Sequence, residues 1–292
     1  MLLVSLGILA YLFSVIPLSA VAASLASASA LPLLLAYLLQ LAMRAFAASR
    51  LALLANRQGI SLSVGSALDI GFATIFYGLF LPGEALTGGF IRWRRLARPE
   101  GKPAEALVTI FFDRTFDTLV LLATGLAFWA AEGPSGQGLI GLALGIALAT
   151  LMAAFLVMRF EGFSPHPALD PFRRLPFSVL VPVLGLSLGY HLLGALSFSA
   201  FALSMDLPIP FIAMGWIRSV VLILTMLPIS ISGIGVREGA LLFVLSSRGV
   251  PPAAALGLSL LFFSGKLFTG AIGGALEARK LLRPRTDRAP TS

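Results

Sequence analysis

The hydrophobic pattern of this chain is one of long, unbroken apolar runs. Residues 1–43, 133–158 and 175–205 contain no acidic or basic side chain apart from one histidine. Each run exceeds the roughly 20 residues that a helix needs to cross the hydrocarbon core of a bilayer. The short alternating strands of a membrane β-barrel are absent from the sequence. The pattern therefore predicts an all-α polytopic membrane protein with about six transmembrane helices, at residues 2–23, 31–50, 104–131, 138–158, 177–205 and 252–277.

The basic residues indicate which helix ends face the cytoplasm, because cytoplasmic loops carry an excess of Lys and Arg. Of the 21 Lys and Arg residues, 16 lie in four segments, at residues 44–57, 92–102, 159–174 and 279–288. We therefore expect both termini in the cytoplasm. We also expect one transmembrane domain over residues 1–278, followed by a short basic cytoplasmic tail, 279–292.

Two further segments do not fit as simple spans. Residues 58–91 connect two cytoplasmic segments, and residues 211–248 connect two external ones. Each is therefore expected to enter the membrane and return to the side from which it came, as a re-entrant hairpin. Because the hairpins start from opposite sides, repeat 1 (about 31–131) and repeat 2 (about 177–277) are predicted to have inverted topology.

A similar sequence motif occurs once in each half of the chain. Residues 81–92 read LPGEALTGGFIR, and residues 227–238 read LPISISGIGVRE. Proline and clustered glycine interrupt helices. Interrupted segments at matching positions of two halves are the best sequence pointer to the substrate site of a transporter. We expect the hairpin backbone to be broken at Pro82, Gly83, Gly88, Gly89, Pro228, Gly233 and Gly235.

Several ionisable residues fall inside the predicted spans and hairpins. An ionised side chain at the centre of a membrane helix costs roughly 2.5 to 3.5 kcal/mol on insertion scales, so each needs a partner or water. Arg114 can reach Asp117 one turn further along its helix. For Lys266 we expect Glu238 as the first partner and Asp113 as the second. The full set is Asp69, Glu84, Asp113, Arg114, Asp117, Arg218, Arg237, Glu238 and Lys266.

Arg92 and Arg237 each close one of the glycine-rich hairpins. A guanidinium binds phosphate oxygens in a bidentate way, and helix N-termini add unpaired N–H groups. We therefore expect a pocket for an anionic head group, with contacts drawn from Arg92, Arg237, Glu238, Asp113, Arg114, Lys266 and Glu84. The alternative is that these charges form internal salt bridges, in which Arg237 neutralises Glu238.

The composition and net charge reduce the number of candidate functions. Apolar residues make up 58% of the chain, charged residues 12%, and the mean hydropathy is +0.96. The net charge of +8 is spread along the cytoplasmic side, which suits anionic inner-leaflet lipid rather than nucleic acid. The run RWRRLARPEGK (92–102) could contact head groups, with Trp93 at the interface, or could serve topology alone. The sequence has no Walker motif, no metal-ligand spacing and no cysteine, so we expect no cofactor, no metal and no catalytic residue.

Three stretches carry a resemblance to a known family: GFATIFYGLFLPGEALTGGFIRWRRLAR (71–98), DRTFD (113–117) and LPISISGIGVREGALLFVL (227–245). They resemble the transmembrane region of lysylphosphatidylglycerol synthase, the flippase part of the bacterial multiple peptide resistance factor. The family also has stand-alone members, including ones linked to hopanoids and to archaeal dolichol-sugar pathways. The resemblance implies lipid translocation between leaflets, with Arg92, Asp113, Arg114, Arg237 and Glu238 at motif positions. The aminoacyl-transfer domain of the full-length synthase has no counterpart after residue 277, so aminoacylation is not expected.

We therefore predict a lipid transporter and not an enzyme. It would be a flippase-like carrier for an anionic phospholipid or isoprenoid lipid in the bacterial cytoplasmic (inner) membrane. One alternative is a membrane-embedded lipid phosphatase. It could draw only on Glu84, Glu238 and the hydroxyls of Thr87, Ser230 and Ser232, while His191 is expected to be a hydrogen-bonded helix residue. The other is a non-transporting partner of a lipid-synthesis complex, so lipid-synthesis enzymes are candidate protein partners beside the membrane lipid itself.

Overall fold

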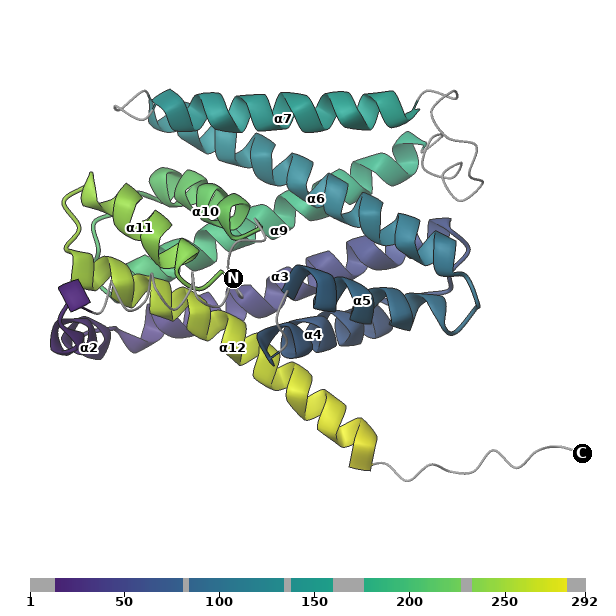
Figure 1. Cartoon of the computed structure of the whole chain (residues 1–292), viewed down its shortest axis with the longest axis horizontal. Coiled ribbons are helices and arrows are strands. Elements are labelled where there is room, and N and C mark those ends of the chain that lie inside the picture. The colour runs from purple at the N-terminus through teal and green to yellow at the C-terminus, as the bar shows by residue number, and fades with distance from the viewer. Residues whose placement is uncertain (1–13, 81–83, 134–137, 160–175, 227–232, 283–292) are drawn as a thin grey trace, which may run out of the picture.

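The computed structural model describes residues 14–80, 84–133, 138–159, 176–226 and 233–282 (Figure 1). Within these ranges every regular element is a helix, which confirms the all-α prediction. The helices are α2 (Leu18–Ala26), α3 (Ala30–Arg57), α4 (Val64–Phe80), α5 (Glu84–Ala97), α6 (Pro103–Glu132), α7 (Gly138–Arg159), α9 (Phe177–Ser204), α10 (Phe211–Met226), α11 (Val236–Ser246) and α12 (Pro252–Leu282).

Four of these helices, α3, α7, α9 and α12, are long and apolar enough to cross a membrane. Helix α6 has 30 residues, but its middle carries Asp113, Arg114 and Asp117. Helices α4 and α10 are apolar but shorter, with 17 and 16 residues. The chain is therefore a multi-pass helical membrane protein.

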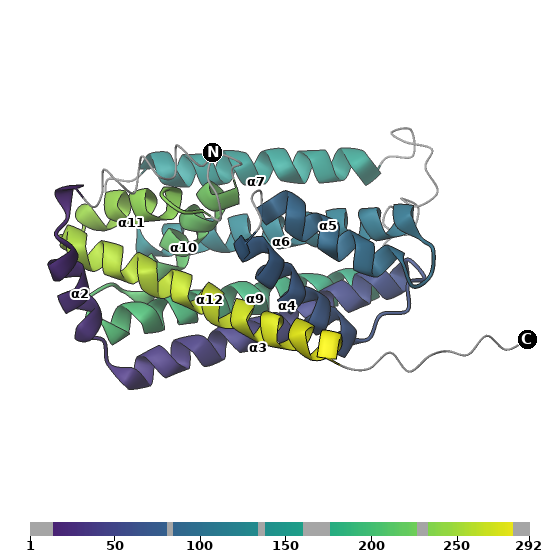
Figure 2. The same cartoon turned by 60° about the horizontal axis from the view of Figure 1, so that its bottom comes forward.

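The long helices run along the long axis of the molecule, with α3 and α9 side by side through its middle (Figures 1 and 2). The connections 58–63 and 98–102 lie at the end of the long axis at which α12 ends (Figure 1). The connections 205–210 and 247–251 lie at the opposite end. The pair α4 and α5 therefore begins and ends at one end of the molecule, and the pair α10 and α11 at the other.

The two halves of the chain contact each other in matching ways. Helix α4 packs on α12, and α10 packs on α6. Glycines allow close approach at both contacts. A Cβ added at Gly273 of α12 would lie 2.3 Å from the carbonyl oxygen of Phe72 in α4. A Cβ added at Gly215 of α10 would lie 2.5 Å from the ring of Phe128 in α6.

The predicted helix boundaries are most accurate where proline or glycine begins a helix. Helices α6, α7 and α9 lie within one residue of their predicted ranges. The predicted ends are wrong where basic residues follow: α3 continues past residue 50 to Arg57, α5 continues past residue 91 to Ala97, and α12 continues past residue 277 to Leu282. Lys and Arg are good helix formers and are favourable in a last turn, so these helices continue into the basic segments.

The first predicted helix, at residues 2–23, is also corrected. Pro17 has an extended backbone, with φ −61° and ψ 127°, and directly precedes α2. Proline lacks a backbone N–H and clashes with the preceding turn, so a continuous helix through this position is disfavoured. Helix α2 runs across the end of the molecule and not along its long axis (Figure 2). Residues 2–13 of the predicted span lie outside the described residues.

Candidate functional site

Arg50 of α3 is the centre of a buried group of charged side chains. Its Nε donates to Asp113 Oδ1 at 2.8 Å, and its Nη1 donates to Asp117 Oδ1 at 2.5 Å and to Ser187 Oγ at 2.9 Å. The side chains of Arg50 and Asp113 are only 3% and 2% exposed. Asp113 and Asp117 lie one turn apart on α6, so this helix presents both carboxylates to one guanidinium.

Arg92 of α5 approaches the same carboxylate from the other side. Its Nη1 donates to Asp113 Oδ2 at 2.8 Å, so each oxygen of Asp113 binds a different arginine. The Nε of Arg92 is buried and has no hydrogen-bond partner among the described residues. A buried donor without a partner costs about 1–3 kcal/mol. Arg92 therefore retains hydrogen-bonding capacity that the described side chains do not use.

The group extends through α9 to Arg218 of α10. Arg218 Nη1 lies 3.2 Å from His191 Nδ1. A guanidinium has only donors, so Nδ1 accepts, and Nε2 carries the proton. Nε2 donates this proton to the backbone oxygen of Asp117 at 3.0 Å. A Cβ added at Gly194 would lie 2.3 Å from the Arg218 guanidinium, so this glycine provides the space that Arg218 occupies.

Arg44 joins the group through Tyr190. Its Nη2 donates to the Tyr190 hydroxyl at 3.3 Å. The guanidinium carbons of Arg44 and Arg218 lie 5.6 and 5.9 Å from the centroid of the Tyr190 ring. Cations near an aromatic ring are stabilised by its negative face, which does not neutralise their charge. The Nε of Arg44, like that of Arg92, is buried and has no hydrogen-bond partner in the described part of the chain.

We call this connected set the interior network, and its described members carry excess positive charge. The charged residues are Arg44, Arg50, Arg92, Arg218, Asp113 and Asp117. Two carboxylates therefore face four guanidinium groups. Charges inside a membrane are expensive unless they are paired. An anionic ligand is the group that this arrangement is suited to bind.

The second half of the chain builds a self-contained group around Arg237, which we call the Arg237 group. Arg237 Nη2 donates to Glu238 Oε1 at 2.5 Å, and Arg237 Nε donates to Ser259 Oγ at 2.9 Å. The Ser259 hydroxyl donates to Glu238 Oε1 at 2.8 Å. The N–H of Gly235 donates to Glu238 Oε2 at 2.6 Å. Glu238 therefore caps the start of α11 and neutralises the arginine beside it.

Arg92 and Arg237 thus each bond to the long helix that follows them in the chain. Arg92 reaches Asp113 of α6, 21 residues further along the chain. Arg237 reaches Ser259 of α12, 22 residues further along. The partner on the following long helix is therefore a carboxylate for Arg92 and a hydroxyl for Arg237.

Two clusters of ion pairs lie towards the ends of the molecule. In the α12 clamp, Arg95 at the end of α5 pairs with Glu277 of α12 and, at 3.1 Å, with Asp69 of α4. Lys280 of α12 pairs with both of these acids.

In the α6 clamp, Arg248, which follows α11, donates to both carboxylate oxygens of Glu132 at 2.8 Å. The indole N–H of Trp216 in α10 donates to the same carboxylate. Each clamp therefore ties one helix pair to the last turns of the long helix of the other half.

A family model for the lysylphosphatidylglycerol synthase transmembrane region matches residues 1–274. This chain belongs to that family. The match covers the interior network, the Arg237 group and the α6 clamp, and it confirms the resemblance that the motifs carry. No curated protein matches the chain significantly.

The motif positions of the lysylphosphatidylglycerol synthase family fall into two groups in the structure. Arg92 and Asp113 contact each other in the interior network, and Arg237 and Glu238 contact each other in the Arg237 group. Arg114, the fifth position, is exposed on α6. Asp117, its predicted partner, makes its ion pair with Arg50 instead.

The other predicted contacts are placed as follows. Lys266 is half-buried on α12. Its two expected partners form ion pairs with arginines: Glu238 with Arg237, and Asp113 with Arg50 and Arg92. Glu84 begins α5, and its side chain lies outside the described part of the structure. Asp69 belongs to the α12 clamp.

The glycines of the two family motifs differ in their roles. Gly233 and Gly235 have φ angles of +77° and +87°, a backbone conformation that favours glycine, and directly precede α11. Gly88 and Gly89 lie inside α5, and their prediction as backbone breaks is wrong. A Cβ at Gly88 would lie 2.9 Å from the Thr74 methyl group, so this glycine serves helix packing. Pro82, Gly83 and Pro228 lie outside the described residues.

Sequence reasoning missed Arg50, Arg44, Ser187 and Tyr190. Arg50 was assigned to the basic segment 44–57, and hence to the cytoplasmic boundary, because α3 was expected to end there. The available signal was the pair Asp113 and Asp117, which needs a buried cation from another helix. His191 is a hydrogen-bonded helix residue, as expected. Among the described residues, no group of three acidic or histidine side chains is placed to hold a metal ion.

Proposed function

We propose that this protein moves an anionic phospholipid or isoprenoid lipid between leaflets, and that Arg92 holds its phosphate. The observation that carries the proposal is the excess of guanidinium groups in the interior network. A phosphate has the charge that this network lacks and can accept from the unused Nε donor of Arg92. Membership of a lipid-linked membrane family supports a lipid as the ligand.

We further propose that the two halves form an inverted repeat with two re-entrant hairpins, α4–α5 and α10–α11. The matching contacts of α4 with α12 and of α10 with α6 support this. So do the opposite ends from which the two helix pairs start (Figure 1). In such repeats the substrate site lies where the broken segments meet near the middle of the membrane.

The two clamps then serve as the two gates of alternating access. By the distribution of basic residues, the α12 clamp faces the cytoplasm and the α6 clamp faces outside. Each clamp joins a hairpin of one half to a long helix of the other half. Breaking one clamp frees one hairpin to move without disturbing the other. Gates built in this way can open in turn.

A transporter is favoured over a lipid phosphatase by the state of the acidic side chains. Hydrolysis of a diphosphate needs a carboxylate or histidine that can activate water. Asp113, Asp117 and Glu238 are each held in an ion pair with an arginine. His191 is bonded on both ring nitrogens. We therefore propose binding and translocation without a chemical step.

The test is transport by purified protein in liposomes that contain phosphatidylglycerol with a fluorescent acyl chain. Dithionite added outside destroys only the label in the outer leaflet, so it reports movement from the inner leaflet. We expect transport by the unaltered chain and a loss of at least about tenfold in Arg92→Gln, which corresponds to about 1.4 kcal/mol. Asp113 keeps Arg50 as a partner in this variant, so folding is expected to persist.

The matched control is Arg57→Gln, which removes an equal charge from the exposed end of α3. Its transport should equal that of the unaltered chain. Equal transport by Arg92→Gln and Arg57→Gln would contradict the phosphate role of Arg92. Release of inorganic phosphate from a polyprenyl diphosphate by the unaltered protein would instead favour the enzyme.

A further inference from the structure

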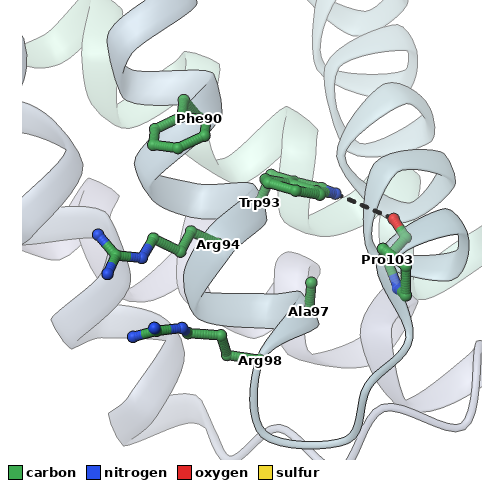
Figure 3. Close-up of a pocket in the computed structure, with 6 residues that line it drawn as sticks. All are labelled: Phe90, Trp93, Arg94, Ala97, Arg98 and Pro103. Atoms are coloured by element: carbon green, nitrogen blue, oxygen red, sulfur yellow. Dashed lines mark hydrogen bonds between the residues drawn. The ribbon is translucent and has the colours of Figure 1, made fainter.

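The outer face of α5 carries a groove that is separate from the interior network. It has a volume of about 320 Å³ and is lined by Phe90, Trp93, Arg94, Ala97, Arg98 and Pro103 (Figure 3). Four of these residues belong to α5, Arg98 directly follows it, and Pro103 begins α6. The groove is therefore fixed by one helix and by the turn that follows it.

The three arginines of α5 and Arg98, which directly follows the helix, point in two directions. Arg92 and Arg95 turn inward and pair with Asp113 and with the acids of the α12 clamp. Arg94 and Arg98 are exposed, lie one turn apart and extend to the same side of the helix (Figure 3). Among the described residues, neither forms an ion pair with a carboxylate. Their guanidinium groups extend away from Trp93 and Pro103 (Figure 3), so two adjacent cations that the described part of the protein does not neutralise lie beside the groove, at its edge.

The rest of the groove is apolar, and a hydrogen bond positions its largest side chain. The indole N–H of Trp93 donates to the backbone oxygen of Pro103 at 3.0 Å, which fixes the ring between α5 and α6 (Figure 3). The rings of Phe90 and Trp93 lie 5.8 Å apart. Further along α6, Leu107 and Phe111 are 61% and 47% exposed.

Along both helices, the exposed side chains become less polar with distance from the α5–α6 connection. Arg94 and Arg98 lie near the end of α5 that joins α6, and Phe90 lies a turn or more further in. On α6, Leu107 and Phe111 are likewise further in than Pro103. A lipid has the same order, with phosphate at the membrane surface and acyl chains below it. Arginine also suits phosphate through its planar pair of donors.

We propose that this groove binds an anionic glycerophospholipid of the cytoplasmic leaflet, with Arg94 and Arg98 on its phosphate and Phe90, Trp93 and the α6 side chains along its acyl chain. The proposal rests on the proposed function only for the side of the membrane on which the groove lies. It assigns no transport step to this lipid.

The experiment uses the full chain in bilayers and the fluorescence of Trp93. Phosphatidylglycerol with brominated acyl chains is compared with brominated phosphatidylcholine at the same mole fraction, in a background of unlabelled phosphatidylcholine. We expect stronger quenching by brominated phosphatidylglycerol, equivalent to a preference of about fivefold for each arginine. The preference should disappear in Arg94→Gln/Arg98→Gln. The same lipid pair tested on Trp93→Phe should show no difference, because Trp129 and Trp216 lie elsewhere.

The matched control is Arg57→Gln/Arg279→Gln, which removes two exposed charges from other helix ends and should keep the preference. The transport variant Arg92→Gln should also keep it, which separates this site from the proposed function. Loss of the preference in the control pair would overturn the proposal, because general surface charge would then explain it. A preference that persists without Arg94 and Arg98, or without Trp93, would overturn it equally.

Discussion

The interior network and the Arg237 group occupy corresponding places in the two halves and balance their charges in opposite ways. Arg237 is neutralised by the next residue of its own helix, and the side chains that bind it belong to α11 and α12. Arg92 depends on Asp113 of α6, which it shares with Arg50 of α3. The network then continues through α9 to α10.

Under the proposed function, this difference makes Arg237 a structural arginine and Arg92 a ligand-binding one. A pair formed by neighbours on one helix stays neutral however that helix moves. A pair shared among α3, α5 and α6 changes its charge balance when those helices shift. A similar motif can therefore keep its geometry in both halves of the chain, while the described residues leave excess positive charge around only one of them.

The largest expected effect follows from removing the shared carboxylate with Asp113→Asn. Arg50 would keep only Asp117, and Arg92 would lose its ion-pair partner. Leaving buried charges unpaired is expected to lower the free energy of unfolding by about 3–5 kcal/mol. Chemical unfolding of the purified protein in one detergent measures this. Asp206→Asn, at an exposed acid between α9 and α10, is the control. An equal change in both variants would show that Asp113 is not structurally required.

The second effect tests whether the Arg237 group is self-contained. Arg237→Gln and Glu238→Gln should each lower the free energy of unfolding by about 3 kcal/mol, because each strands the other charge. The double variant should recover most of this loss and retain transport. The double-mutant cycle gives the coupling energy between the two residues. A double variant that is stable but does not transport lipid would indicate that Arg237 binds the lipid head group.

The positions of proline and glycine in the sequence predict where many of the helices begin. Pro252 and Gly138 begin long helices at the expected residues, and Pro103 begins α6 one residue before the expected start. The pair of motifs at 81–92 and 227–238 identifies Arg92 and Arg237 as arginines at matching positions. Charge predicts the ends less well, since basic residues show where the chain meets head groups and a helix can continue past that point, as α3 does.

The sequence does not predict which acidic side chain pairs with which basic one. Arg50 and Asp113 are 63 residues apart and meet only because α3 and α6 pack together. Local spacing predicts Arg114 as the partner of Asp117, yet Arg114 is exposed and Asp117 pairs with Arg50. The role of Gly88 also cannot be predicted from the local sequence, because it depends on contact with Thr74 in another helix. Contacts between distant helices decide which charges are partners.

A smaller effect is expected from arginine-to-lysine changes, which keep the charge and remove the planar pair of donors. Arg92→Lys should reduce transport of the fluorescent lipid about tenfold, or about 1.4 kcal/mol in the barrier. Arg237→Lys should leave transport within about a factor of two of the unaltered chain, because Glu238 still has a cation beside it. Equal losses in the two variants would restore a symmetric role for the two arginines.

The smallest effect concerns the clamps, where Glu277→Gln and Glu132→Gln remove partly exposed ion pairs worth about 1 kcal/mol or less. The chain has no cysteine, so Thr74→Cys and Thr225→Cys each provide a single reporter, one in each helix pair. Glu277→Gln should speed thiol labelling at position 74 and slow it at 225. Glu132→Gln should do the reverse, because a ligand-free transporter that opens more often at one end is open less often at the other. If both variants speed labelling at the same position, the clamps do not act as alternating gates, and their role is limited to holding the two halves together.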